Sequence, residues 1–303
     1  RCWVCCERNG EPIWIGYIWS RTYQSQSKTI QLYAESFENF PWHQLIRIDI
    51  ETVVDFGTKI FRDLWNTMQA SATGRNMNII VPSTFPEAGV TALIQVLASD
   101  FKYFGEVMST LADAAGTGFD WTIDVTRDGP RYLKSLRFGY PTLGAVDAGL
   151  ITFDYPGSIL NYYATETMGD AGTHVFVLGE GEGSEMVLGQ SVQATMITQG
   201  WPRWDVTVSR KDATLQSHVN NIATNEGILR KPPRLVVKPS MKADKVPEFG
   251  SFALGDACTL NLKDARFPLG LSFTSRITRW ALQPQSTENS DEFAITFAGD
   301  EGV

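Results

Sequence analysis

The segment best suited to hold a nucleotide is the glycine-rich run 179–184, which follows the apolar run His174–Leu178. A dinucleotide-binding loop also follows a strand, and it leads into a helix whose N-terminus attracts the pyrophosphate. Here the third glycine of the G-x-G-x-x-G frame is missing, the next residues are typical of a strand, and Glu180 and Glu182 would repel phosphate. The sequence therefore predicts a hairpin loop, and a calcium site on Glu180, Glu182 and Glu185 is the alternative.

The cysteines could supply a metal centre or a redox pair, and the chain has Cys2, Cys5, Cys6 and Cys258. The first three fall in one predicted strand, where Cys2 and Cys6 share a face about 13 Å apart and Cys5 points the other way. That separation exceeds the reach of a disulfide, and three sulfurs on two faces do not converge on one zinc ion. We therefore predict buried or free thiols, with metal or redox use as the alternative.

The histidines show no metal-binding spacing. His43, His174 and His218 are far apart in the sequence, and no two of them have the i, i+4 spacing that places two ligands on one helix face. Packed or surface roles are therefore favoured over catalysis. The chain also lacks a G-x-S-x-G motif, so nothing local supports serine hydrolase chemistry.

Three aspartates invite a glycosidase interpretation. Asp113, Asp120 and Asp124 could provide the two carboxylates that cleave a glycosidic bond, a reaction that requires a set distance between them. Helix-cap and strand-edge roles are the favoured alternative. No catalytic, cofactor-binding or metal-ligating residue is predicted, and the chain is not expected to be an enzyme or to carry a cofactor.

The tryptophans are the remaining candidates for binding. Trp42, Trp201 and Trp204 stand beside proline and polar residues, so we expect them to be exposed and to make interface or glycan contacts. Other tryptophans stand inside apolar runs and are expected in the core: Trp14, Trp19, Trp121 and Trp280.

The elements that position these residues begin with a hairpin. Asn9 and Gly10 separate two apolar runs, which predicts a type I′ turn between strands at 3–7 and 13–19. A third strand is expected at 28–34. The chain begins inside this first sheet, so we expect its opening strands to lie outside the given sequence.

Helical periodicity appears in the middle of the chain. Residues 51–69 and 101–115 repeat apolar residues at helical spacing, and 88–99 is a further candidate helix. Strand patterns dominate after residue 118, interrupted by one expected helix near 210–224 that follows a capping-box pattern.

These patterns predict a mainly β chain with an α/β insertion, an α+β fold class. We expect the remainder of an N-terminal β-barrel domain at 1–48, a helix-containing α+β domain at 49–140, and β-rich structure with one helix at 141–303. The chain has 303 residues, 43% of them hydrophobic, which suffices for a sizeable core.

The charge excludes one class of partner. Acidic residues number 34 against 26 lysines and arginines, a net charge of −8. That balance argues against a surface that grips nucleic acid. No run of 18 or more apolar residues occurs, so no membrane-spanning helix is predicted.

Several stretches together resemble a minor tail protein of long-tailed phages that infect actinobacteria, of the tail-tip (baseplate) hub type. In chain order they are residues 20–30 (SRTYQSQSKTI), 60–66 (IFRDLWN), 118–125 (GFDWTIDV), 178–183 (LGEGEG), 200–203 (GWPR) and 276–284 (RITRWALQP). The resemblance covers most of the chain. It implies small β-barrel domains of the hub type and a structural role at the tip of the virion tail.

The resemblance also implies partners. Such hubs are expected to form a homotrimer that closes the distal end of the tail tube and matches hexameric rings above it. Expected neighbours are the distal tail protein ring, the C-terminus of the tape measure protein and other tail-tip proteins. Phage DNA would pass through without specific binding, and an acidic wall would help it slide.

A second function stays open at this point: a tail-tip module that binds or hydrolyses the carbohydrate of the host cell envelope. The two differ in observable behaviour, because a hub should form trimers and bind tail proteins, whereas the alternative should bind or cut cell-wall glycan. A nucleotide enzyme would depend on the glycine-rich run alone.

Overall fold

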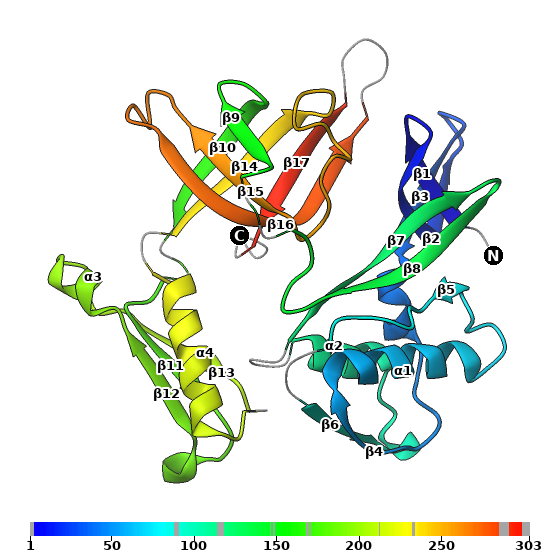
Figure 1. Ribbon diagram of the computed structural model, residues 1–303, viewed down its shortest axis with the longest axis horizontal. Helices are drawn as coiled ribbons and strands as arrows, with labels where there is room; N and C mark the ends of the chain where they lie inside the picture. The colour runs from blue at the N-terminus through cyan, green and yellow to red at the C-terminus, as the bar shows by residue number, and fades with distance from the viewer. Residues whose placement is uncertain are drawn as a thin grey trace. The chain divides into compact units, whose positions relative to one another are not determined.

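The computed structural model describes residues 3–87, 91–113, 118–145, 147, 149–167, 169, 171–211, 213–231, 234–284 and 291–298. The chain divides into two compact units, Arg1–Leu143 (unit 1) and Gly144–Val303 (unit 2). Strands predominate in both units, so the predicted mainly β, α+β fold class is confirmed (Figure 1). The division into domains at residues 48 and 140 stays a prediction.

The first sheet of unit 1 is an antiparallel meander of β1 (Trp3–Arg8), β2 (Glu11–Gln24) and β3 (Thr29–Ser36). Asn9 and Gly10 both have positive φ, 55° and 84°, and the residues on either side of them pair across the turn. This is the backbone that a type I′ turn requires, so the predicted hairpin is confirmed.

The rest of unit 1 alternates short strands and helices (Figure 1). Its elements are the 3-10 helix η1 (Phe37–His43), β4 (Ile50–Phe56), α1 (Gly57–Ala70), β5 (Ile79–Ile80), β6 (Thr91–Val96), the 3-10 helix η2 (Ala98–Asp100), α2 (Phe104–Ala112), β7 (Asp120–Asp128) and β8 (Arg131–Gly139). β4 pairs with β6 as an antiparallel two-stranded ribbon, and β5, β8 and β7 form a second small sheet.

The core of unit 1 forms around the apolar face of α1. The ring centroid of Phe61 lies 5.6 Å from that of Phe119, 4.9 Å from that of Trp121 and 5.5 Å from that of Phe138. Phe61 is fully buried, and burial of such a side chain contributes about 1.5–3 kcal/mol. Trp121 belongs to β7 and Phe138 to β8, so α1 packs against that hairpin.

The predicted helix boundaries need correction. The helix expected at 51–69 begins only at Gly57, because the preceding β-branched residues pair with β6 as strand β4. The helix expected at 101–115 begins at Phe104, and Phe101 is in the left-handed conformation, which ends the preceding turn. The helix expected at 88–99 is wrong, because its described part contains strand β6.

Unit 2 contains a six-stranded sheet in the order β10-β14-β17-β16-β15-β9. Its strands are β9 (Thr152–Tyr155), β10 (Ile159–Thr167), β14 (Arg234–Lys242), β15 (Ala257–Leu262), β16 (Leu271–Gln283) and β17 (Glu292–Phe297). The end strands β9 and β10 are consecutive in the chain and contact each other. The sheet therefore curls into a half-barrel (Figure 1). Phe153, Phe249 and Phe293 lie in its core.

The other sheet of unit 2 has the order β12-β11-β13 and a helix packed against it. Its elements are β11 (His174–Leu178), the 3-10 helix η3 (Gly183–Glu185), β12 (Leu188–Val192), α3 (Ala194–Thr198), β13 (Asp205–Ser209) and α4 (Gln216–Leu229). The helix expected near 210–224 is thus displaced toward the C-terminus, because the chain first completes β13 in parallel with β11. Within the described residues, no helix is both long and apolar enough to cross a membrane.

Candidate assembly surfaces

The glycine-rich run 179–184 is the loop of a hairpin, as predicted. β11 and β12 pair on either side of it, and a short 3-10 turn stands where a nucleotide loop would begin a helix. Polar groups of this loop form hydrogen bonds with other parts of the chain. Glu180 N donates to Ala213 O at 3.0 Å, and Lys211 Nζ donates to Gly181 O at 2.7 Å. The backbone N–H groups of Gly179 and Glu180 are therefore engaged within the chain.

Metal-binding clusters do not occur in the part of the chain that the structure describes, where no three His, Cys, Asp or Glu side chains gather. The described cysteines are free thiols: Cys5 is partly buried, Cys6 is exposed and Cys258 is buried. Cys2 lies outside the described residues. Burial, with a smaller effect from Asp256, raises the pKa of the Cys258 thiol to about 12.

The aspartates that invited a glycosidase interpretation have local structural partners. Asp113 ends α2 and accepts a hydrogen bond from Ser109 Oγ at 2.7 Å. Asp120 accepts one from the backbone N–H of Leu143, and Asp124 pairs with Arg137 on the neighbouring strand at 2.6 Å. Cap and strand roles account for these carboxylates, as favoured from the sequence.

The histidines lie in separate surroundings. His43 stacks on Trp19 with ring centroids 4.8 Å apart, and its Nε2 lies 3.8 Å from a carboxylate oxygen of Glu35. His174 is buried and stacks on Phe176, with Nδ1 3.5 Å from Asp205. These contacts are those of packed side chains, in line with the expectation from the sequence.

Trp42 borders a small hollow of about 110 Å³ in unit 1. Trp42 is 45% exposed, and its ring packs against α2, where a Cβ at Gly105 would come within 2.6 Å of it. Glu38 and Asp113 also line the hollow, but both carboxylates already accept hydrogen bonds from the protein. The hollow is smaller than ligand pockets, which measure about 300–1,000 Å³.

Trp201 and Trp204 lie in unit 2, in the connection between α3 and β13. Trp204 N donates to Thr173 Oγ1 at 2.8 Å, and its carbonyl accepts from the N–H groups of Thr173 and His174. The backbone is thus fixed against β11 while the Trp204 ring stays exposed. The expectation that Trp42 and Trp204 are exposed is confirmed, and Trp201 is half-buried. Their use as interface or glycan contacts stays a prediction.

One exposed apolar surface of unit 1 is the outer half of the β2–β3 hairpin, residues 19–33, which we call the hairpin tip. Every residue of the tip is exposed. Tyr23 pairs with Ile30 and Arg21 pairs with Leu32, and these pairs lie two positions apart, so all four side chains share one face. Apart from Arg21, that face is apolar.

The expectation that Trp19 lies in the core is wrong, because the side chain is 57% exposed. The described part of β1 pairs with β2 as far as the Trp3–Tyr17 pair. Trp19 is the extra residue of a bulge in β2, because Ile18 pairs with Ala34 and Ser20 pairs with Tyr33. An alternating sequence pattern does not show where such a bulge interrupts it.

A second apolar surface covers the outer face of the β4–β6 pair, which we call the ribbon. Val54 and Leu93 are directly paired and are 61% and 69% exposed. Leu97 continues the outward alternation of β6 and is also exposed, whereas Ile94 and Val96 point into the core. The ribbon therefore has one buried and one open face.

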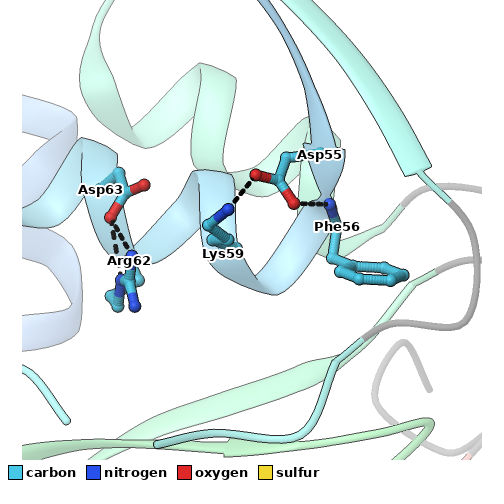
Figure 2. Close-up of polar contacts among 5 residues, drawn as sticks. All are labelled: Asp55, Phe56, Lys59, Arg62 and Asp63. Atoms are coloured by element: carbon cyan, nitrogen blue, oxygen red, sulfur yellow. Dashed lines mark hydrogen bonds and ion pairs between the residues drawn. The ribbon is translucent and has the colours of Figure 1, made fainter. Parts of the chain in front are cut away.

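Polar contacts attach the ribbon to α1 (Figure 2). At the end of β4, Asp55 accepts a hydrogen bond from Phe56 N at 2.9 Å and pairs with Lys59 one helical turn later. These contacts, the one from Lys59 foremost, lower the pKa of the Asp55 carboxyl. Arg62 and Asp63 form an ion pair on the next turn. Asp55 thus links the ribbon to the core helix.

Sequence reasoning identified neither surface. The hairpin tip includes the connection between the strands expected at 13–19 and 28–34, and most of the ribbon falls within the helices expected at 51–69 and 88–99. One signal was available: residues 12–34 contain no acidic residue in an acidic chain, and they include the alternating apolar positions of β3.

Comparison with known proteins gives the fold. No protein-family model and no curated protein matches the sequence of the chain. Among solved structures, the chain is similar to the 43 kDa tail protein of prophage MuSo2 from Shewanella oneidensis, with a TM-score of 0.61 and 11% identity over 95% of this chain and 77% of that one.

Two further structures agree. A tail protein from Neisseria meningitidis matches with a TM-score of 0.59 and 10% identity, over 95% of this chain and 81% of that one. Prophage tail protein gp18 from Listeria monocytogenes matches with a TM-score of 0.52 and 12% identity, over 98% and 79%. At nearly full length and with little sequence identity, the chain has the fold of solved phage tail proteins.

Proposed function

We propose that the chain is a structural component of a phage virion, a tail-tip hub that closes the distal end of the tail tube and organises tip proteins for attachment and DNA ejection. The observation that carries the proposal is the tail-protein fold, shared over 95% of the chain with the prophage MuSo2 protein. The exposed apolar hairpin tip and ribbon support it, because large assemblies need such contact surfaces.

The hub would act as a homotrimer. Its partners would be the distal tail protein ring above, the C-terminus of the tape measure protein and further tip proteins, with the host envelope beyond. The net charge of −8 suits a passage that DNA crosses without binding, since like charges do not attract. No step of this role requires a catalytic residue or a cofactor.

Locating the chain in assembled particles tests the proposal. Antibody labelling or averaged electron-microscopy images of virions should place three copies at the distal end of the tail. A chain that is absent from purified virions, or that lies in the capsid or along the tube, would contradict the proposal. Phage lacking the gene should form heads but no infectious particles with complete tips.

Binding of cell-wall carbohydrate is the second candidate, favoured by the exposed Trp42 ring beside the carboxylates of Glu38 and Asp113. Pull-down of the purified chain with host cell-wall glycan tests it. Binding that Trp42→Ala abolishes would support this function, with Tyr163→Ala as a control at an exposed aromatic residue that is not a candidate glycan contact. The small volume of the hollow favours the structural role.

A further inference from the structure

The apolar face of the hairpin tip is exposed. β2 and β3 pair along the tip, and Tyr23, Ile30 and Leu32 on that face are 63%, 63% and 49% exposed. Exposed apolar faces of this kind mark sites of association. The tip is therefore a candidate contact surface.

The charge of the hairpin tip limits which protein surfaces can bind to it. Residues 12–34 contain Arg21 and Lys28 and no Asp or Glu, although the whole chain has a net charge of −8. Two tips would meet with like charges, which disfavours a symmetric contact of tip with tip. The tip instead suits a surface that is apolar and acidic.

The ribbon is such a surface. Its strands and their immediate flanks, residues 48–56 and 91–100, contain no Lys or Arg, and beside Asp55, which pairs with Lys59, they contain the acidic residues Asp49, Glu51 and Asp100. Val54 and Leu93 supply the exposed apolar centre described above. Both ribbon strands also have an open edge within the described residues, which another strand could extend.

We propose that the hairpin tip of one copy of this chain docks on the ribbon of a second copy. Tyr23, Ile30 and Leu32 would cover Val54 and Leu93, with Arg21 and Lys28 against the acidic flanks. The contact joins two different patches, so it repeats from copy to copy and closes into a ring when the rotation between copies allows. This inference rests on the proposed function and extends it by naming the two surfaces that form the oligomer.

Charge reversal in the purified full chain tests the contact. Arg21→Glu/Lys28→Glu should weaken self-association at least tenfold by analytical ultracentrifugation, and so should Glu51→Lys/Gln95→Lys on the ribbon, because each places like charges across the contact. Combining all four changes in one chain should restore association. Arg131→Glu/Lys231→Glu makes the same charge change at exposed positions elsewhere and should have no effect.

A mixing experiment distinguishes two different patches from one self-complementary patch. Tyr23→Ser/Leu32→Ser disables the tip, and Val54→Ser/Leu93→Ser disables the ribbon, without changing charge. Each variant alone should be monomeric, and an equal mixture should give a one-to-one complex, because a single intact tip–ribbon contact remains. Circular dichroism and melting temperature show that each variant is folded.

Cross-linking supplies a readout that does not depend on stability. A photo-reactive phenylalanine analogue in place of Ile30 should link to residues 48–56 or 91–100 of another copy, identified by mass spectrometry. A wild-type chain that stays monomeric, tip variants that associate normally, links to another region, or association only with a different tail protein would each overturn the proposal. If the chain is found at the tail tip and these variants still associate, this inference fails while the proposed function stands.

Discussion

Burial governs the reactivity of the cysteine side chains in this protein. Cys258 is an example, because it is fully buried in the half-barrel of unit 2 and the pKa of its thiol is raised to about 12. Only the thiolate reacts as a nucleophile, so a thiol with that pKa is almost entirely unreactive at neutral pH.

Alkylation of the native protein should therefore distinguish the thiols. Iodoacetamide at neutral pH should modify exposed Cys6 first, whereas Cys258 should react only after unfolding. Peptide mass spectrometry of native and urea-unfolded samples measures both. Equal labelling of Cys258 and Cys6 in the native protein would contradict the burial described for β15.

The contribution of Asp55 to the stability of the folded state should depend on pH. Its pKa is lowered by the contacts with Lys59 and Phe56. A lowered pKa stabilises the folded state above the unfolded carboxyl pKa, about 3.9, and this contribution is lost as the pH falls through the folded value. Asp55→Asn should therefore cause a small loss of stability at neutral pH that shrinks in acid.

Urea unfolding of Asp55→Asn and wild type at about pH 7, 5 and 3 tests this. The difference in unfolding free energy between wild type and Asp55→Asn should be the same at the two higher pH values and smaller at the lowest pH. Asp63→Asn removes a carboxylate from the next helical turn and serves as the control, with little effect at any pH. A difference for Asp55→Asn that stays constant down to the lowest pH contradicts the assignment.

At the scale of elements, glycine decides how closely α4 approaches its sheet. A Cβ at Gly189 on β12 would lie 2.6 Å from the carbonyl oxygen of Val219, a backbone atom of α4. A backbone atom cannot rotate away as a side-chain end can, so the whole helix would have to move. Gly179, in the run that first suggested a phosphate loop, also serves packing, because a Cβ there would lie 2.9 Å from the Val219 side chain of α4.

Gly189→Ala should destabilise unit 2 by about 1–3 kcal/mol, the usual cost of overpacking. Chemical denaturation followed by tryptophan fluorescence measures the change. Gln190→Ala, at the exposed neighbouring position, should be close to neutral. If Gly189→Ala were as stable as wild type, the close packing of α4 on β12 would be incorrect.

The sequence predicted which turns and helices exist more accurately than it predicted the residues at which the helices begin. The Asn9-Gly10 turn was predictable because its conformation is local, and so was the glycine-rich hairpin loop. The start of α1 was not, because the apolar residues of β4 continue the helical spacing and only pairing with β6 makes them a strand. Exposure of Trp19 accompanies a bulge in β2, which the apolar pattern of that strand does not show.

At the scale of the whole molecule, the two compact units have separate cores, one around Phe61 and one around Phe293. We therefore expect more than one unfolding step. Calorimetry should give a measured unfolding enthalpy larger than the value calculated from the width of the transition. Limited proteolysis should cut near Leu150, which is 77% exposed, and release a fragment of each unit. Equal enthalpies together with resistance to cleavage would contradict this prediction.

The hairpin tip has a consequence for the life of the newly made chain. Exposed apolar strands also template aggregation, so association of the chain competes in time with its precipitation. Arg21 and Lys28 should slow that precipitation, since their like charges keep two free tips apart at high concentration. Under the proposed role in a phage tail, synthesis of the chain should therefore be matched to assembly of the particle that it joins.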